Sequence, residues 1–173
     1  TDAVGATITA TVAITEPAAA LSVSVSPTNI NCNALCSGNA AAAGAGGTSP
    51  YTYLWNTAPA QSAATATGLC AGNYTCAITD AKGCAVTQTI SIAQSPAIVS
   101  SVSVTATGCG NNNGSAIVNA SGGTGSFTYS WNSSPAQNTQ TATNLPAGNY
   151  TLTVTDSNNC TQTQTVTVAS STG

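Results

Sequence analysis

The sequence predicts an all-β fold, and three observations support this prediction. Several runs alternate polar and apolar residues with a period of two, as in residues 86–92. Segments rich in Gly, Pro, Asn and Asp separate these runs at short intervals. No segment has the heptad spacing of an amphipathic helix. We therefore expect short strands joined by turns along the 173 residues of the chain.

An internal repeat predicts the domain organisation. Residues 38–95 match residues 114–171 without a gap, at an offset of 76. We expect residues 18–96, called the first copy below, and residues 97–173, the second copy, to form one sandwich each. Residues 1–5 resemble residues 79–83, so residues 1–17 are expected to be the last strand of a preceding repeat, in a processed or excerpted chain.

The expected strands follow from the alternation. The first covers residues 7–15 and alternates Thr with apolar side chains; its apolar face, called the assembly strand below, consists of Ile8, Ala10, Val12 and Ile14. Further strands are expected at residues 51–55, 74–78 and 86–92, with equivalents in the second copy.

A Trp in the third strand and a Tyr that opens the sixth are typical of an immunoglobulin-like β-sandwich of about seven short strands. The predicted core residues are Trp55, Tyr74, Trp131 and Tyr150. The two tyrosines are candidates for a tyrosine corner, in which the hydroxyl bonds to a nearby backbone carbonyl.

The composition excludes several functions. The chain has one Lys, no Arg, no His and four acidic residues, so it has no basic patch for nucleic acid or anionic lipid. No apolar run is long enough to insert into a membrane. Without a general base, a metal cluster or a phosphate loop, we expect no enzyme activity and no cofactor. Asp80 and Asp156 are the same position in two copies, so a role in a hairpin turn is favoured over acid–base chemistry or calcium binding.

A row of aromatic residues allows two interpretations. Tyr51, Tyr53 and Trp55, and their equivalents Phe127, Tyr129 and Trp131, fall on one face of a strand. Such a row could stack on sugars, but a small sandwich needs this face in its core, and we favour the core.

The ordered motifs resemble the SprB repeat family of large surface adhesins of gliding bacteria. They are a Cys, a Gly, a Gly-Gly-Thr turn, a Tyr-x-Tyr-x-Trp strand, an Ala-Gly-Asn-Tyr-Thr turn and a Val-Thr-Asp followed by a Cys. In the second copy they begin at Cys109 and end at Cys160, and Phe127 stands for the first Tyr of the strand. The resemblance implies tandem repeats exported to the cell surface, with roles in adhesion, motility or filament building. It implies no catalytic residues.

Seven cysteines without His indicate disulfides in an oxidising compartment. Aligning the copies matches Cys32 with Cys109 and Cys84 with Cys160, and we expect bridges Cys32–Cys84 and Cys109–Cys160. If the loop with the first cysteine does not reach along the side of the sandwich, bridges between adjacent domains are the alternative. The remaining expectations are a Cys36–Cys70 bridge and a buried free thiol at Cys76, which stands where the second copy has Leu152.

These observations predict an extracellular, non-enzymatic repeat of a surface filament or adhesin stalk. The expected partners are copies of the same protein, joined end to end by β-strand pairing, and O-linked glycans on exposed Ser or Thr. Whether the assembly strand is donated to a neighbouring chain or belongs to a longer tandem array stays open. The alternative function is a module that binds glycans or a surface.

Overall fold

The computed structural model describes residues 10–12, 19–108 and 110–171. Throughout these ranges the chain forms strands, turns and irregular segments, and none of it forms a helix that could cross a membrane. The all-β prediction is therefore confirmed.

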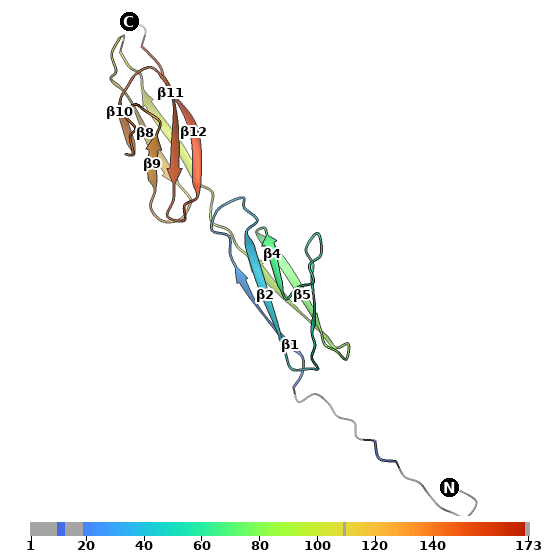
Figure 1. Ribbon diagram of the computed structural model, residues 1–173. Coiled ribbons are helices and arrows are strands. Elements are labelled where there is room, and N and C mark those ends of the chain that lie inside the picture. The colour runs from blue at the N-terminus through green and yellow to red at the C-terminus, as the bar shows by residue number, and fades with distance from the viewer. Residues whose placement is uncertain (1–9, 13–18, 109, 172–173) are drawn as a thin grey trace, which may run out of the picture. The chain divides into compact units, whose positions relative to one another are not determined.

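Within the described ranges each copy contributes six strands, many of them labelled in Figure 1. Those of the first copy are β1 (Ser22–Thr28), β2 (Gly38–Ala45), β3 (Thr52–Trp55), β4 (Thr65–Leu69), β5 (Gly72–Thr79) and β6 (Ala85–Ile92). Those of the second are β7 (Val99–Thr105), β8 (Gly114–Ser121), β9 (Thr128–Trp131), β10 (Thr141–Leu145), β11 (Gly148–Thr155) and β12 (Thr161–Val168).

The strands of each copy form two three-stranded sheets. The orders are β1-β2-β4 and β3-β5-β6 in the first copy, and β7-β8-β10 and β9-β11-β12 in the second. In the second copy, β11 pairs antiparallel with β12 from Gly148 opposite Val168 to Thr155 opposite Thr161. This arrangement of two facing antiparallel sheets is the sandwich that the alternation predicts.

The alternation of side chains explains which face of each sheet is buried. In β12, Val166 and Val168 are buried while Thr165 and Thr167 are exposed. Inward side chains from both sheets of the second copy make up one core: Ala116, Val118, Trp131, Ala142, Leu145, Leu152, Val154, Val166 and Val168. Because successive residues of a strand point to opposite faces of the sheet, this strand places its Val side chains in the core and its Thr side chains in solvent.

Both tryptophans are completely buried. The Trp131 indole N–H donates to the carbonyl of Thr139 at 3.0 Å, and that of Trp55 to the carbonyl of Ala63 at 2.9 Å. The burial of an indole is favourable only if its N–H finds an acceptor, and here a loop carbonyl supplies one in each copy. Tyr150 is half-buried, and its hydroxyl donates to the carbonyl of Pro146, four residues upstream, as in a tyrosine corner.

The chain divides into two compact units, and these do not coincide with the sequence copies at residues 18–96 and 97–173. The first unit comprises Thr1–Ser26, Ala41–Ala66 and Tyr74–Ile90. The second comprises Pro27–Ala40, Thr67–Asn73 and Ser91–Gly173. One end of the first copy is thus grouped with the second copy, and the domain boundary at residues 96 and 97 stays a prediction.

Candidate functional site: the Cys32–Cys160 joint

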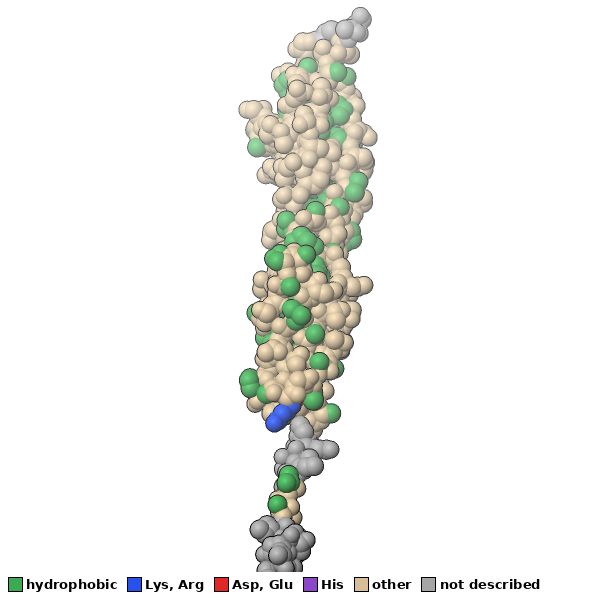
Figure 2. All heavy atoms as spheres, turned by 90° about the vertical axis from the view of Figure 1, so that its right-hand side faces the viewer, with side chains coloured by type: hydrophobic (Ala, Val, Ile, Leu, Met, Phe, Trp, Pro, Cys, Tyr) green, Lys and Arg blue, Asp and Glu red, His purple; other side chains and the backbone are tan. Residues whose placement is uncertain are grey.

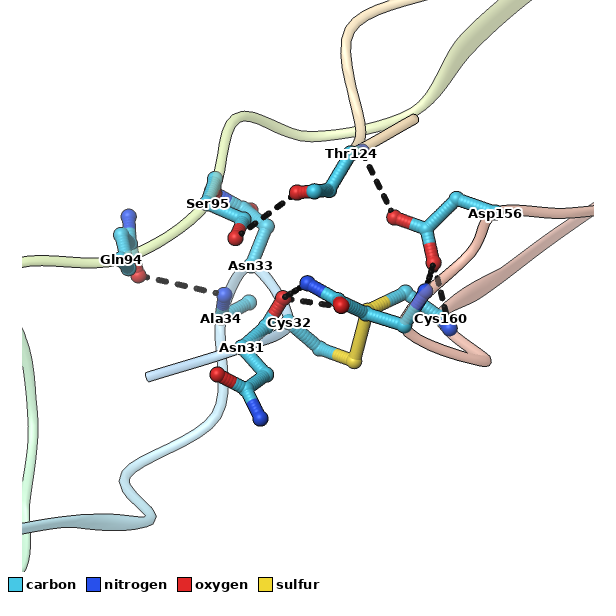
Figure 3. The surroundings of a disulfide bond; sticks show 10 residues. Asn31, Cys32, Asn33, Ala34, Gln94, Ser95, Thr124, Asp156 and Cys160 are labelled. Carbon is cyan, nitrogen blue, oxygen red and sulfur yellow. Dashed lines mark hydrogen bonds between the residues drawn. A yellow bond between two sulfur atoms is a disulfide. The ribbon is translucent and has the colours of Figure 1, made fainter. Parts of the chain in front are cut away.

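A disulfide inside the second unit connects the two sequence copies (Figure 3). Cys32, in the segment between β1 and β2, is bonded to Cys160, in the turn between β11 and β12. The two residues are 128 positions apart in the sequence, and their Cα atoms are 5.4 Å apart. This covalent link is the feature of the structure with the clearest consequence for function.

The turn that carries Cys160 is built around a buried carboxylate. Asp156 Oδ1 accepts hydrogen bonds from the backbone N–H groups of Asn158 and Cys160, both at 2.9 Å. Its Oδ2 accepts one from the N–H of Thr124, also at 2.9 Å. Asn159 takes a positive φ of 61°, a conformation that Asn tolerates better than most residues. Asp and Asn thus shape a tight turn that fixes the backbone of Cys160.

These contacts also decide the ionisation of Asp156. Its burial alone would raise the pKa, because desolvation disfavours the charged form. The hydrogen bonds from the N–H groups of Cys160, Thr124 and Asn158 outweigh burial and hold the pKa below its ordinary value. The carboxylate is therefore charged at neutral pH and already occupied by backbone donors, which is the turn role that the sequence predicts.

The segment that carries Cys32 is attached to the chain that leaves β6. Ile30 donates its N–H to the carbonyl of Ala93 at 2.8 Å and accepts from the N–H of Ser95 at 3.1 Å. Two longer contacts, from Ala34 N–H to Gln94 Oε1 at 3.4 Å and from Asn33 Nδ2 to the Ser95 carbonyl at 3.5 Å, hold the rest of the segment (Figure 3).

Polar contacts accompany the disulfide. The Asn158 side-chain amide donates to the carbonyl of Asn31 at 3.4 Å, and Thr124 Oγ1 donates to Ser95 Oγ at 3.2 Å. Asn31, Asn158 and Ser95 could not be predicted as contact residues, because single Asn and Ser residues give no recognisable signal in a chain rich in both. Together with the disulfide, these contacts define what we call the joint.

The predicted Cys32–Cys84 bridge is wrong, since Cys32 is bonded to Cys160. The reason is the length of β6. Ile30 forms a parallel bridge with Gln94, just after β6 ends, whereas Cys84 precedes its first residue. The eight residues of β6 separate these two positions by about 26 Å at roughly 3.3 Å per residue. The bond that the structure contains instead, Cys32–Cys160, joins the two sequence copies.

The predicted Cys109–Cys160 bridge is wrong for the same reason. Cys160 precedes β12, while Thr107 forms its parallel bridge with Ser170, beyond the end of β12. Cys109 itself lies outside the described residues.

The other cysteines fall into three environments. Cys36 and Cys70 form the second disulfide, the pair expected from the sequence. Cys76 is a buried free thiol, and Cys84 is an exposed free thiol instead of the bridge partner that was expected. Burial raises the pKa of Cys76, and a hydrogen bond from the backbone of Leu54 lowers it by less.

The aromatic row is part of the core in each copy. Phe127 and Tyr129 are half-buried and pack against the core that contains Trp131. Tyr51 and Tyr53 are also half-buried, and the Tyr51 hydroxyl donates to the carbonyl of Gly46. The row therefore does not present three aromatic faces to solvent.

The assembly strand lies mostly outside the described residues. Ala10 and Val12 are described, are exposed and belong to no strand, whereas Ile8 and Ile14 lie outside the described ranges. Within the described part of the chain, no three His, Cys, Asp or Glu side chains are grouped as metal ligands.

Comparison with solved structures gives distant similarities to immunoglobulin-domain proteins. The N-terminal eight immunoglobulin domains of Down Syndrome Cell Adhesion Molecule match with 10% identity and a TM-score of 0.40, over 88% of this chain and 25% of that one. This chain thus spans a quarter of that structure. DIP-gamma IG1+IG2 matches with 10% identity and a TM-score of 0.35, over 84% of this chain and 93% of that one. The structure of Dpr11 IG1 bound to DIP-gamma matches with 12% identity and a TM-score of 0.33, over 83% of this chain and 93% of that one.

No curated protein matches the chain at a significant level. The family model of the SprB repeat matches residues 109–136, which include β8 and β9. This is the family that the ordered motifs of the sequence resemble, so the comparison confirms the resemblance over residues 109–136.

Proposed function

We propose that this chain is a structural repeat of an extracellular bacterial surface filament or adhesin stalk. The observation that carries the proposal is the joint, in which a disulfide links one sequence copy to the next. Covalent links between consecutive repeats suit a protein that must keep its length and resist unfolding and proteolysis outside the cell. The SprB match supports the coarser assignment to an adhesin-like repeat module.

The surface supports the same proposal. Ser, Thr, Asn, Gln and Gly take the place of charged residues, and the face shown in Figure 2 is almost free of charged side chains. Its hydrophobic side chains are scattered rather than gathered in one large patch. Such a surface suits O-linked glycosylation or packing within a polymer better than electrostatic capture of a charged ligand.

A catalytic function has little support. The chain contains no His to activate a nucleophile, and the Cys76 thiol is buried with a raised pKa, so it is protonated at neutral pH. Among the described carboxylates, Asp80 and Asp156 each accept three hydrogen bonds from backbone N–H groups. These hydrogen bonds give both carboxylates a structural role in their turns.

The alternative, a glycan-binding module, rested on an exposed aromatic row. Because both tryptophans are buried and their neighbours half-buried, this row offers no stacking platform. Assembly by donation of the assembly strand remains part of our proposal, since an alternating, uncharged strand needs a sheet edge to pair with.

Electron microscopy of the purified native material, combined with intact-mass analysis, tests the proposal. We expect regular filaments whose subunits have the 16.7 kDa mass of this chain plus glycan. Isolated particles that bind selectively on a glycan array would contradict a stalk function and favour the binding module. One polypeptide much longer than this chain would instead contradict donation of the assembly strand between chains.

A further inference from the structure

A hollow of about 380 Å³ lies in the second copy, beside the turn that connects β10 to β11. Its lining comes from two segments, one between residues 132 and 137, after β9, and the other between residues 143 and 150. Both segments belong to the second unit, and all the lining residues are described. The volume falls within the range of about 300–1,000 Å³ that is typical of small-molecule sites.

The side chain of Gln137 fixes the two lining segments to each other. Gln137 Nε2 donates to the carbonyl of Thr143 at 2.9 Å, and Gln137 Oε1 accepts from the N–H of Thr143, also at 2.9 Å. The backbone carbonyl of Gln137 accepts from the N–H of Trp131 at 2.8 Å. One residue thus pairs with β9 through its backbone and with β10 through its side chain. The hollow is therefore formed before any ligand arrives, which reduces the entropy cost of binding.

Two further polar side chains of the lining are oriented by bonds to the backbone. Asn132 Oδ1 accepts from the N–H of Thr151 at 2.7 Å. The Tyr150 hydroxyl donates to the carbonyl of Pro146 at 2.8 Å. These bonds leave the Asn132 NH₂ group as a donor and the Tyr150 hydroxyl oxygen as an acceptor for a ligand.

The lining also contains two polar side chains, Ser134 and Asn144, that make no hydrogen bond within the described ranges. Asn144 has a positive φ of 54°, a conformation that Gly adopts more readily. In the first copy, the same two positions are Ala58 and Gly68, and Gly68 has a φ of 66°. The fold of a copy therefore requires neither the hydroxyl nor the amide, whereas the second copy has both beside one hollow.

The chemistry of the lining indicates the class of ligand. None of the lining residues is charged, so an ionic ligand would lose its hydration without gaining a counter-charge. The amide and hydroxyl groups are combined with the rings of Pro135, Pro146 and Tyr150. A neutral hexose matches this combination, because its hydroxyls can exchange hydrogen bonds with the polar groups while its C–H groups pack against the rings.

We propose that this hollow is a binding site for one neutral hexose unit, with Asn132, Ser134, Asn144 and Tyr150 as its polar contacts. Two sources can supply such a unit: a free saccharide, or the terminal sugar of an O-linked glycan on another copy of the chain. The site goes beyond the proposed stalk function and does not depend on it.

Titration of the isotope-labelled, unglycosylated full chain with glucose, galactose and mannose, followed by nuclear magnetic resonance, tests the site. At least one of these hexoses is expected to shift the side-chain NH₂ signals of Asn132 and Asn144 in a saturable manner. The uronate of the same sugar is expected to bind more weakly, because its carboxylate has no partner in the lining.

The first copy supplies the matched variants. Ser134→Ala and Asn144→Gly introduce the residues that the first copy has at these positions, so the fold should be retained. Each is expected to weaken hexose binding by about two- to tenfold, the effect of one lost hydrogen bond. Thr163→Ala, which changes an exposed residue of β12 outside the hollow, should bind as the wild type does.

Three results would overturn the site: no saturable shift with any of the hexoses, shifts confined to residues outside the hollow, or wild-type affinity in Ser134→Ala/Asn144→Gly. Equal affinity for the uronate would overturn the neutral class of ligand.

Native material distinguishes the two sources of the sugar. Retention of radiolabelled hexose by untreated material indicates a free saccharide as the ligand. Retention only after enzymatic removal of glycans indicates that a glycan of another copy fills the hollow, and retention in neither state would overturn the site. Native filaments that bind no hexose would remove this inference and leave the proposed function intact. Isolated native particles that bind hexose at this hollow would contradict the stalk function alone.

Discussion

At the scale of single residues, the two buried aspartates illustrate how this chain uses its few charges. Each carboxylate lies at the start of a hairpin turn and accepts backbone N–H bonds from its own turn and from the Gly-Gly-Thr segment. The role of each Asp in its turn could be predicted, because an Asp shortly before a Gly or Asn is a local sequence pattern of turns in which the carboxylate accepts backbone N–H bonds. The bond to Thr48 or Thr124 was not, because it joins residues 32 positions apart.

The variant Asp156→Asn should have a lower melting temperature at pH 7, because its amide places an NH₂ group opposite at least one backbone N–H donor. The folded pKa of Asp156 is lowered, so its stabilisation is complete above the unfolded pKa of about 3.9 and is lost as the pH falls through the folded pKa. Thermal unfolding followed by circular dichroism from pH 7 to pH 2 checks this. The difference in melting temperature between wild type and variant should narrow below about pH 4. A difference that stays constant from pH 7 to pH 2 would contradict stabilisation by the charged carboxylate.

At the scale of the elements, the alternation of side chains predicted the strands well. The expected strands at residues 51–55, 74–78 and 86–92 correspond to β3, β5 and β6. Alternation works here because each sheet has one buried and one solvated face, so burial leaves its period in the sequence. The same reasoning could not show where the first half of each copy packs, because β2 and β8 are dominated by small residues whose period is weak.

The Gly-Gly-Thr turn depends on glycine in both copies. Gly122 has φ of 75°, and a Cβ at this position would collide with the backbone carbonyl of Ala97. We expect Gly122→Ala to lower the free energy of unfolding by more than about 1–2 kcal/mol, the cost of the left-handed conformation alone. Urea unfolding measures the change.

Gly148→Ala serves as the matched control for that turn. A Cβ at Gly148 would contact only the Tyr150 hydroxyl, at 3.9 Å, so this change should cost little or should stabilise by up to about 1 kcal/mol. Equal losses of unfolding free energy for Gly122→Ala and Gly148→Ala would contradict the collision with the Ala97 carbonyl as the reason why this turn requires glycine.

At the scale of the whole molecule, the disulfides could be predicted from the sequence only in part. Aligning the copies identifies equivalent positions, and Cys32 with Cys109 and Cys84 with Cys160 are indeed equivalent. Equivalence does not say which pairs are near in space. The Cys36–Cys70 pair could be inferred because both residues lie in loops at one end of the copy, whereas Cys32–Cys160 depends on how one copy follows the next.

Loss of the joint should destabilise the protein through the unfolded chain. A bond between residues 128 positions apart restricts the unfolded state strongly, and such bonds typically stabilise by about 2–4 kcal/mol. We expect Cys32→Ser/Cys160→Ser to unfold at lower urea concentration and to be cleaved faster by a nonspecific protease. Cys84→Ser, which removes an exposed free thiol, should leave both properties of the monomer unchanged.

The most direct test of the central claim is a disulfide map of the monomeric chain. Free thiols are alkylated first, the chain is digested without reductant, and cross-linked peptides are identified by mass spectrometry. The structure predicts a peptide pair that joins Cys32 to Cys160, another that joins Cys36 to Cys70, and alkylated Cys84. A peptide pair joining Cys32 to Cys84, or Cys109 to Cys160, would contradict the joint and with it the covalent link between consecutive copies.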